Sequence, residues 1–109
     1  MKKTPILIVF VLLISNMVYS QDYSGKKYIK QINKEYSQKL QLTANESKEF
    51  EQILLKYNHQ LKDAEQDKNF FNKILKEQTI AIFNLVSEEQ YTYYKKIVLE
   101  LEPYKKFKF

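Results

Sequence analysis

The sequence predicts an all-α protein: a small helical hairpin flanked by an N-terminal and a C-terminal helix, about four helices in all. Gly25 is the only glycine, and Pro103 is the only proline after it, so almost nothing between them interrupts a helix. Apolar residues recur at spacings of three and four, which is typical of helices with one buried face. Two segments also carry the side-chain pattern of a helix start.

Both predicted helix starts are capping boxes. Thr43 can accept a hydrogen bond from the backbone N–H of Glu46, while the Glu46 carboxylate can accept one from the N–H of Thr43. The pattern returns 44 residues later, with Ser87 and Gln90. We therefore expect one helix to begin after Thr43 and another after Ser87.

The first twenty residues have the pattern of a secretory signal peptide. Lys2 and Lys3 precede the apolar run 6–14, and compact residues at 18–20 precede Gln21. We expect residues 1–20 to be cut before Gln21, which places the protein in the periplasm or outside the cell. A membrane anchor is the alternative, but nine unbroken apolar residues fall short of the roughly 20 that span a bilayer. No stable membrane span is expected after cleavage.

Residues 21–102 form the predicted helical domain. The first helix should begin near Asp22 or Ser24 and run to about Leu40, and the second should run from Ala44 to about Glu65. Their inward faces share the helical spacing. These faces are Ile29, Ile32, Tyr36 and Leu40 on the first helix, and Phe50, Ile53, Leu54, Tyr57, Leu61 and Ala64 on the second.

A chain reversal capped by Asp67 should separate the second helix from a third, 68–85, and so create the hairpin. The alternative is one long helix over 44–85, which would need a partner chain to cover its apolar stripe. The inward residues of the third helix are Phe70, Phe71, Ile74, Leu75, Ala81, Ile82 and Leu85, and those of the fourth are Tyr91, Tyr94, Ile97, Val98 and Leu101. Pro103 should end the fourth helix, and 103–109 should be a solvated tail.

Composition argues against several classes of function. The net charge of +5 comes from lysine without arginine, which is unfavourable for bidentate recognition of phosphates or bases, so no nucleic-acid partner is expected. The chain has no cysteine, so neither disulfides nor a lipid-modified amino terminus is possible.

No enzyme and no cofactor are expected, because the sequence offers no histidine cluster, no glycine-rich loop and no paired carboxylates beside a nucleophile. His59 should be solvated, since one histidine alone cannot form a zinc site within the chain. A metal site shared across a dimer axis is the alternative.

With these classes of function set aside, the remaining candidates for function are surface residues. Five apolar residues fall outside the inward faces and form a candidate protein-binding or dimer surface: Leu55, Ile80, Phe83, Tyr93 and Leu99. A lysine ridge on the first helix consists of Lys26, Lys27, Lys30 and Lys34. It is either a solvated face or a basic rim that attracts acidic or unfolded chains. Because so small a domain buries a modest core, a homodimer is expected.

The two capped starts, Leu42-Thr43-Ala44-Asn45-Glu46 and Val86-Ser87-Glu88-Glu89-Gln90, resemble the twice-repeated Leu-Thr-x-x-Gln motif of the Spy/CpxP family of periplasmic proteins. Aromatic residues also follow the second motif, as they often do in that family. In this chain Glu46 stands where glutamine is usual, Val86 and Ser87 replace leucine and threonine, and the proline often found after the threonine is missing.

This resemblance, over roughly residues 29 to 102, implies small helical proteins that dimerise into a curved cradle. It implies a cofactor-free chaperone that holds unfolded envelope proteins without ATP. The alternatives are an adaptor that inhibits an envelope stress sensor, as CpxP-like members do, or a purely structural helical protein.

Overall fold

The computed structural model describes residues 22–107, with side chains described as far as 105. The predicted signal peptide, 1–20, lies outside the described residues. The elements are α2 (Lys26–Leu40), α3 (Ala44–Asp63), α4 (Lys68–Leu85), α5 (Glu88–Leu101) and a 3-10 helix, η1 (Pro103–Phe107). The all-α prediction with about four helices is confirmed.

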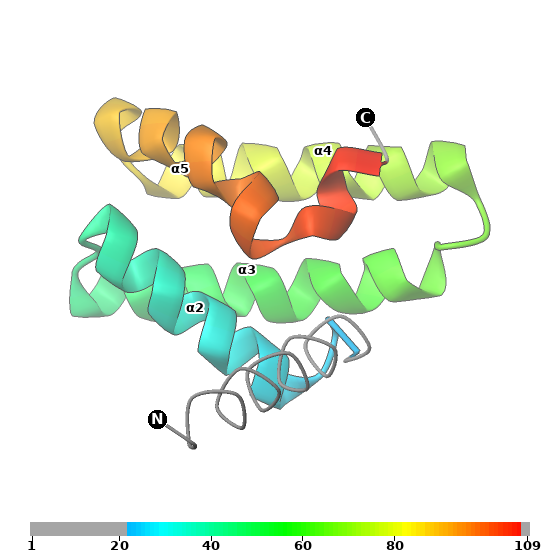
Figure 1. Ribbon diagram of the computed structural model, residues 1–109, viewed down its shortest axis with the longest axis horizontal. Helices are drawn as coiled ribbons and strands as arrows, with labels where there is room; N and C mark the ends of the chain where they lie inside the picture. The colour runs from blue at the N-terminus through cyan, green and yellow to red at the C-terminus, as the bar shows by residue number, and fades with distance from the viewer. Residues whose placement is uncertain (1–21, 108–109) are drawn as a thin grey trace, which may run out of the picture.

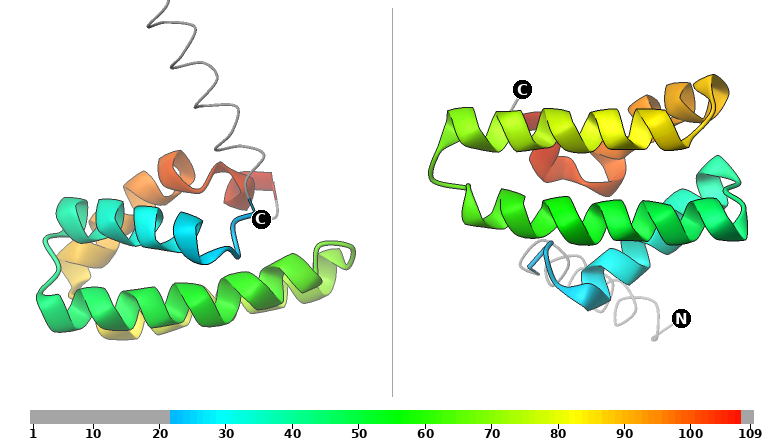
Figure 2. Two further views of the ribbon diagram at one scale, coloured as in Figure 1. Left: turned by 90° about the horizontal axis from the view of Figure 1, so that it is seen from below. Right: turned by 180° about the vertical axis from the view of Figure 1, so that it is seen from behind.

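The helices form two layers. The long helices α3 and α4 run antiparallel as a hairpin, and α2, α5 and η1 lie together on one face of that hairpin (Figures 1 and 2). Seen from behind, the opposite face of α3 and α4 is not covered by another described helix (Figure 2, right). In this layer α2 packs against α5, and α5 packs against η1.

The hairpin turn excludes the alternative of one long helix over 44–85. The backbone N–H of Asp67 donates to the carbonyl of Ala64 at 3.0 Å, which reverses the chain. The Asp67 carboxylate then accepts from the backbone N–H of Phe70 at 3.1 Å and caps α4, as predicted. α3 ends at Asp63, two residues before the predicted Glu65.

Both predicted capping boxes are present. Thr43 and Glu46 exchange their two hydrogen bonds at 2.9 and 3.1 Å, and Ser87 and Gln90 do so at the same two distances. In each case the backbone of the capping residue is extended, and the helix begins at the next residue. The side-chain pattern thus determines where α3 and α5 begin.

The start of α2 differs from the prediction. Neither Asp22 nor Ser24 caps it: Gly25 is the N-cap residue, with no side-chain hydrogen bond, and the helix begins at Lys26. The Asp22 carboxylate instead accepts from the N–H of Ser24 at 2.9 Å, and the Asp22 carbonyl accepts from the N–H of Gly25 at 2.9 Å. The polar side chain closes a turn before the helix, the local alternative that competes with capping.

Two apolar clusters form the core. The larger contains the whole predicted stripe of α2 together with residues of the other helices: Tyr28, Ile29, Ile32, Tyr36, Leu40, Phe50, Leu54, Ile82, Tyr94 and Ile97. The smaller lies between α3 and α4 towards their turn: Leu61, Ala64, Phe71, Ile74 and Leu75. The larger cluster makes α2 and α5 part of one core.

Two residues were assigned to the wrong face. Phe70 was expected inside but is 50% exposed, whereas Phe71 is 1% exposed. Adjacent positions on a helix point about 100° apart, and here Phe71 is the one that packs into the smaller cluster between α3 and α4. Leu55 was expected on the surface but is half-buried and packs against the larger cluster.

The prediction of a solvated tail is also wrong for residues 103–105. Pro103 ends α5 at Leu101 as expected, but the chain continues as η1. Glu102 is 0% exposed and Lys105 is 2% exposed, so this segment returns to the core. None of the helices in the described part of the chain is long and apolar enough to span a membrane.

Candidate functional site

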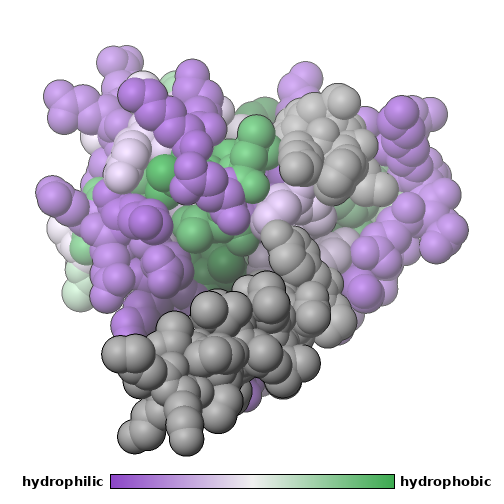
Figure 3. Space-filling model, viewed as in Figure 1, coloured by the Kyte–Doolittle hydropathy of each residue, from purple (hydrophilic) through white to green (hydrophobic). Residues whose placement is uncertain are grey.

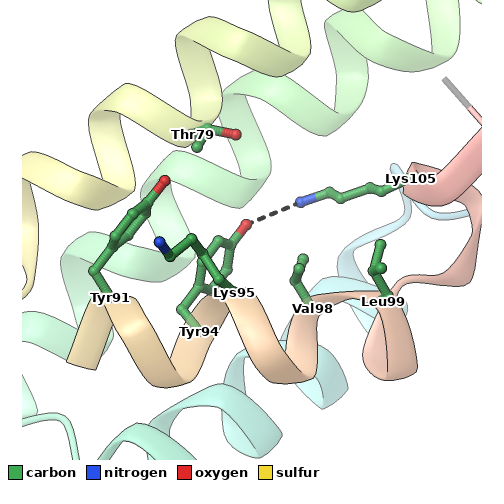
Figure 4. Close-up of a pocket in the computed structure, with 7 residues that line it drawn as sticks. All are labelled: Thr79, Tyr91, Tyr94, Lys95, Val98, Leu99 and Lys105. Carbon is green, nitrogen blue, oxygen red and sulfur yellow. Dashed lines mark hydrogen bonds between the residues drawn. The ribbon is translucent and has the colours of Figure 1, made fainter. Parts of the chain in front are cut away.

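A pocket of about 270 Å³ lies between α4, α5 and η1. Its lining comes from all three elements: Thr79 from α4, Tyr91, Tyr94, Lys95, Val98 and Leu99 from α5, and Lys105 from η1 (Figure 4). Most of the exposed surface in the pocket is apolar. The Thr79 hydroxyl donates within its own helix, to the carbonyl of Leu75 at 2.9 Å, so its hydrogen is already used.

A buried polar cluster supports one wall of this pocket. The Glu102 carboxylate accepts hydrogen bonds from the hydroxyls of Tyr36 and Tyr104 and pairs with the Lys105 ammonium at 3.1 Å. The same ammonium donates to the Tyr94 hydroxyl at 3.3 Å. A buried ion pair needs such additional hydrogen bonds to offset the loss of hydration.

Burial and charge shift the titration of this cluster together. Burial, reinforced by the nearby Glu102 carboxylate, raises the pKa of Tyr36 and of Tyr104 well above the ordinary tyrosine value. Burial also raises the pKa of Tyr94, against the opposing effect of Lys105. Burial disfavours the charge on Lys105, but attraction to Glu102 and the bonds to Glu102 and Tyr94 outweigh it and raise the pKa of Lys105. The amine therefore stays protonated and serves as a hydrogen-bond donor rather than as a nucleophile.

Exposed apolar residues border the pocket. The Phe83 ring, 49% exposed, packs edge to face on the Tyr91 ring with centroids 4.9 Å apart. Ile80, 49% exposed, lies one turn before Phe83 on α4, and Leu99, 44% exposed, lines the pocket itself. We call Ile80, Phe83, Tyr91 and Leu99 the α4–α5 apolar surface.

The structure thus brings together three of the five predicted surface residues. Tyr93 is 43% exposed, but it lies about 200° around α5 from Tyr91 and so faces away from the pocket. Leu55 packs into the core. On the face seen in Figure 3, hydrophobic residues gather near the middle and hydrophilic residues occupy both ends.

The lysine ridge is separate from this surface. Lys26, Lys27, Lys30 and Lys34 are all exposed on α2, which packs against α3 and α5 but not against α4. Lys95 and Lys105 line the pocket itself, and the exposed Lys76 lies one turn before Ile80 on α4. The predicted ridge therefore lies on α2, whereas these three lysines lie on α4, α5 and η1, the elements that form the pocket.

No group of three or more histidine, cysteine, aspartate or glutamate side chains within the described residues could hold a metal ion. His59 is exposed, as predicted, and its Nε2 lies 3.6 Å from the Asp63 carboxylate, one turn further along α3. Both side chains are more than two-thirds exposed, so their interaction is weak.

Sequence reasoning missed the buried cluster. One signal was available: Tyr36 and Tyr94 lie on predicted inward faces, and a buried tyrosine hydroxyl usually finds a hydrogen-bond partner. The partner, Glu102, and its cation, Lys105, have the spacing of three residues that allows pairing across one helical turn. This pairing was not predicted, because Pro103 lies between the two residues and was expected to end the helical structure.

Comparison of the chain with protein-family models, with curated proteins and with solved structures found no match.

Proposed function

We propose that the protein is an exported, cofactor-free protein-binding module that holds unfolded segments of envelope proteins, as the chaperone members of the Spy/CpxP family do. In this proposal it catalyses no reaction and acts as a homodimer. The observation that carries the proposal is the α4–α5 apolar surface, in which Tyr91 and Leu99 line the pocket and Phe83 packs on the Tyr91 ring. Ile80, Phe83 and Leu99 are nearly half exposed, and Tyr91 is half-buried. Contiguous exposed apolar groups of this kind are typical of binding surfaces.

The surrounding charge supports binding to extended chains. Lys76 and Lys95 are exposed beside the apolar residues, and Lys95 also stacks over the Tyr91 ring at 5.3 Å. Lysine offers a mobile point charge without the fixed geometry of arginine. Such a surface favours loosely ordered acidic and apolar segments over one rigid charge pattern.

The direct test is suppression of aggregation of a chemically reduced or heated client by the purified protein. Phe83→Ser should weaken apparent client affinity by about tenfold, as expected for the loss of a central aromatic contact. Tyr93→Ser is the matched control, because Tyr93 is similarly exposed but faces away from the pocket. Its protection should equal that of the parent protein.

The unfolding free energy of both variants must be measured alongside. Phe83 is half-exposed, so the stability cost of Phe83→Ser should be about that of one aromatic pair, 0.5–1.5 kcal/mol. Phe50→Ala, at a position that is 0% exposed, should cost about 3–5 kcal/mol. Equal protection by the parent protein and Phe83→Ser, or no protection at several-fold molar excess, would refute this function.

An adaptor for one folded partner would behave differently. A pull-down from envelope extracts would then recover a single stoichiometric protein rather than many clients. Export is tested by cell fractionation and by sequencing the amino terminus, which should begin at Gln21. Light scattering of the purified protein should give the mass of a dimer.

A further inference from the structure

Two buried donors in the pocket have more hydrogens than the described residues supply acceptors for. The Lys105 ammonium carries three hydrogens, and the described residues supply two acceptors, Glu102 Oε2 and the Tyr94 hydroxyl. The Tyr94 hydroxyl accepts from Lys105, and its own hydrogen has no acceptor among the described residues. Lys105 is 2% exposed and Tyr94 is 3% exposed, and both line the pocket.

An unsatisfied buried donor is costly, so this arrangement favours a ligand with an acceptor oxygen. Figure 4 shows Lys105 and Tyr94 meeting at the pocket, with Val98 and Leu99 beside them. Donors therefore lie at one part of the lining and aliphatic groups at another. A matching ligand has an oxygen on one end and an apolar body on the other.

Charge selects the kind of oxygen. The lining contains two cations, Lys95 and Lys105, and the Glu102 carboxylate that pairs with Lys105 balances one of them. The positive charge that remains is that of the exposed Lys95, and it is complementary to a single carboxylate. The raised pKa of Lys105 keeps its ammonium protonated, so that it remains a hydrogen-bond donor.

Volume sets the size of the ligand. The pocket holds about 270 Å³, which is below the lower bound of roughly 300 Å³ for pockets that take drug-sized ligands. An engineered cavity of about 150 Å³ is enough for benzene. The pocket therefore has room for one ring or short aliphatic chain together with a carboxylate.

We propose that this pocket binds a small monocarboxylate with an aromatic or aliphatic body. Its carboxylate accepts from Lys105 and Tyr94, and its body packs on Val98 and Leu99. The same chemistry is present in a free organic acid and in the last residue of a polypeptide. This inference does not depend on the proposed chaperone function.

Phenylacetate is the first probe, followed by NMR of the labelled methyl groups of Thr79, Val98 and Leu99. Saturable shifts of these three methyl groups are expected. Phenylacetamide should bind more weakly because it is uncharged, and phenethylamine should not bind. N-acetylphenylalanine distinguishes the two sources: tighter binding than phenylacetate indicates a chain terminus, and weaker binding indicates a free acid.

Matched lysine variants test the role of charge without disturbing the buried cluster. Lys95→Gln should weaken phenylacetate binding by about two- to fivefold, whereas Lys96→Gln, an exposed neighbour outside the pocket, should leave it unchanged. Tyr94→Phe should weaken it by about tenfold or more. If Tyr94→Phe does not fold, the comparison of Lys95→Gln with Lys96→Gln and the series of probe ligands still test the proposal. Shifts at other methyl groups only, or equal binding of acid and amide, would overturn the proposal.

Discussion

The side-chain amide of Gln90 donates to the backbone carbonyl of Leu40 at 3.1 Å, which joins the start of α5 to the end of α2. Gln90 also completes the capping box with Ser87 through its carbonyl oxygen. The equivalent residue of the other box, Glu46, has only acceptor oxygens and makes only the local bond. The two boxes therefore differ in function: one starts a helix, and the other also fixes a helix to its neighbour.

This difference predicts unequal responses to exchanging the two residue types. Gln90→Glu keeps an acceptor for the box but removes the donor to Leu40, so it should lower the unfolding free energy by about 1 kcal/mol. Glu46→Gln keeps its box and loses only the favourable charge at the start of α3, about 0.3–1 kcal/mol at low salt. Denaturation in high salt separates the two, because screening removes the charge effects of both substitutions and leaves only the lost bond to Leu40. Equal costs in high salt would show that the bond to Leu40 contributes nothing.

Removal of a capping hydroxyl should cost more than removal of a hydroxyl in a turn. Ser87→Ala and Thr43→Ala should each lower the unfolding free energy by about 0.5–2 kcal/mol, because a backbone N–H at the helix start loses its partner. Ser24→Ala is the control, since Ser24 does not cap α2, and it should change stability by less than about 0.5 kcal/mol. Thermal denaturation followed by circular dichroism measures all three.

The buried ion pair should show strong coupling. Lys105→Met leaves the Glu102 carboxylate, 0% exposed, without its cation and should cost about 3–5 kcal/mol. Adding Glu102→Gln removes the charge while keeping an oxygen that can accept from Tyr36. The double variant should therefore be more stable than Lys105→Met alone by about 1–3 kcal/mol. If the cost of the double variant equals the sum of the costs of Lys105→Met and Glu102→Gln, the two side chains act independently.

Alkaline pH should destabilise the protein through the same cluster. The pKa values of Tyr36, Tyr104 and Lys105 are raised in the folded state, so above about pH 10 the unfolded chain releases protons that the folded chain retains. Their contribution is fully present below that pH and is lost as the pH rises towards the folded-state values. Unfolding in urea at pH 8 to 11 should show this decline, and Tyr36→Phe should make it shallower. An unfolding free energy that does not change between pH 8 and 11 would contradict the raised pKa values of these three residues.

Local rules predicted the frame of the molecule because they depend on neighbouring residues. Thr43, Ser87 and Asp67 begin three helices, and Pro103 ends one, through bonds within a few positions along the chain. The apolar stripe of α2 could also be predicted from its helical spacing, and the structure buries each of its residues. Neither result required knowledge of which helices pack together.

The pocket and the buried cluster depend on that packing. Thr79 and Leu99 lie on different helices, and periodicity along one helix cannot show which residues of another will face it. Phe70 and Phe71 are adjacent residues of the same type, so the sequence does not show which of them is buried. The position of α3 determines this. The role of Glu102 likewise appears only once α2 and α5 are side by side.

The hydrogen bond between Tyr36 and Glu102 spans 66 positions of sequence, so it closes a large loop that includes the whole α3–α4 hairpin. The Glu102 carboxylate is bound by Tyr36 of α2 and by Lys105 of η1, so the detachment of either element would expose it. Partial opening from either end is therefore penalised, and the molecule should unfold as one cooperative unit. Deuterium should then enter the central amides of α2 and α5 at a common slow rate, set by global unfolding rather than by fraying.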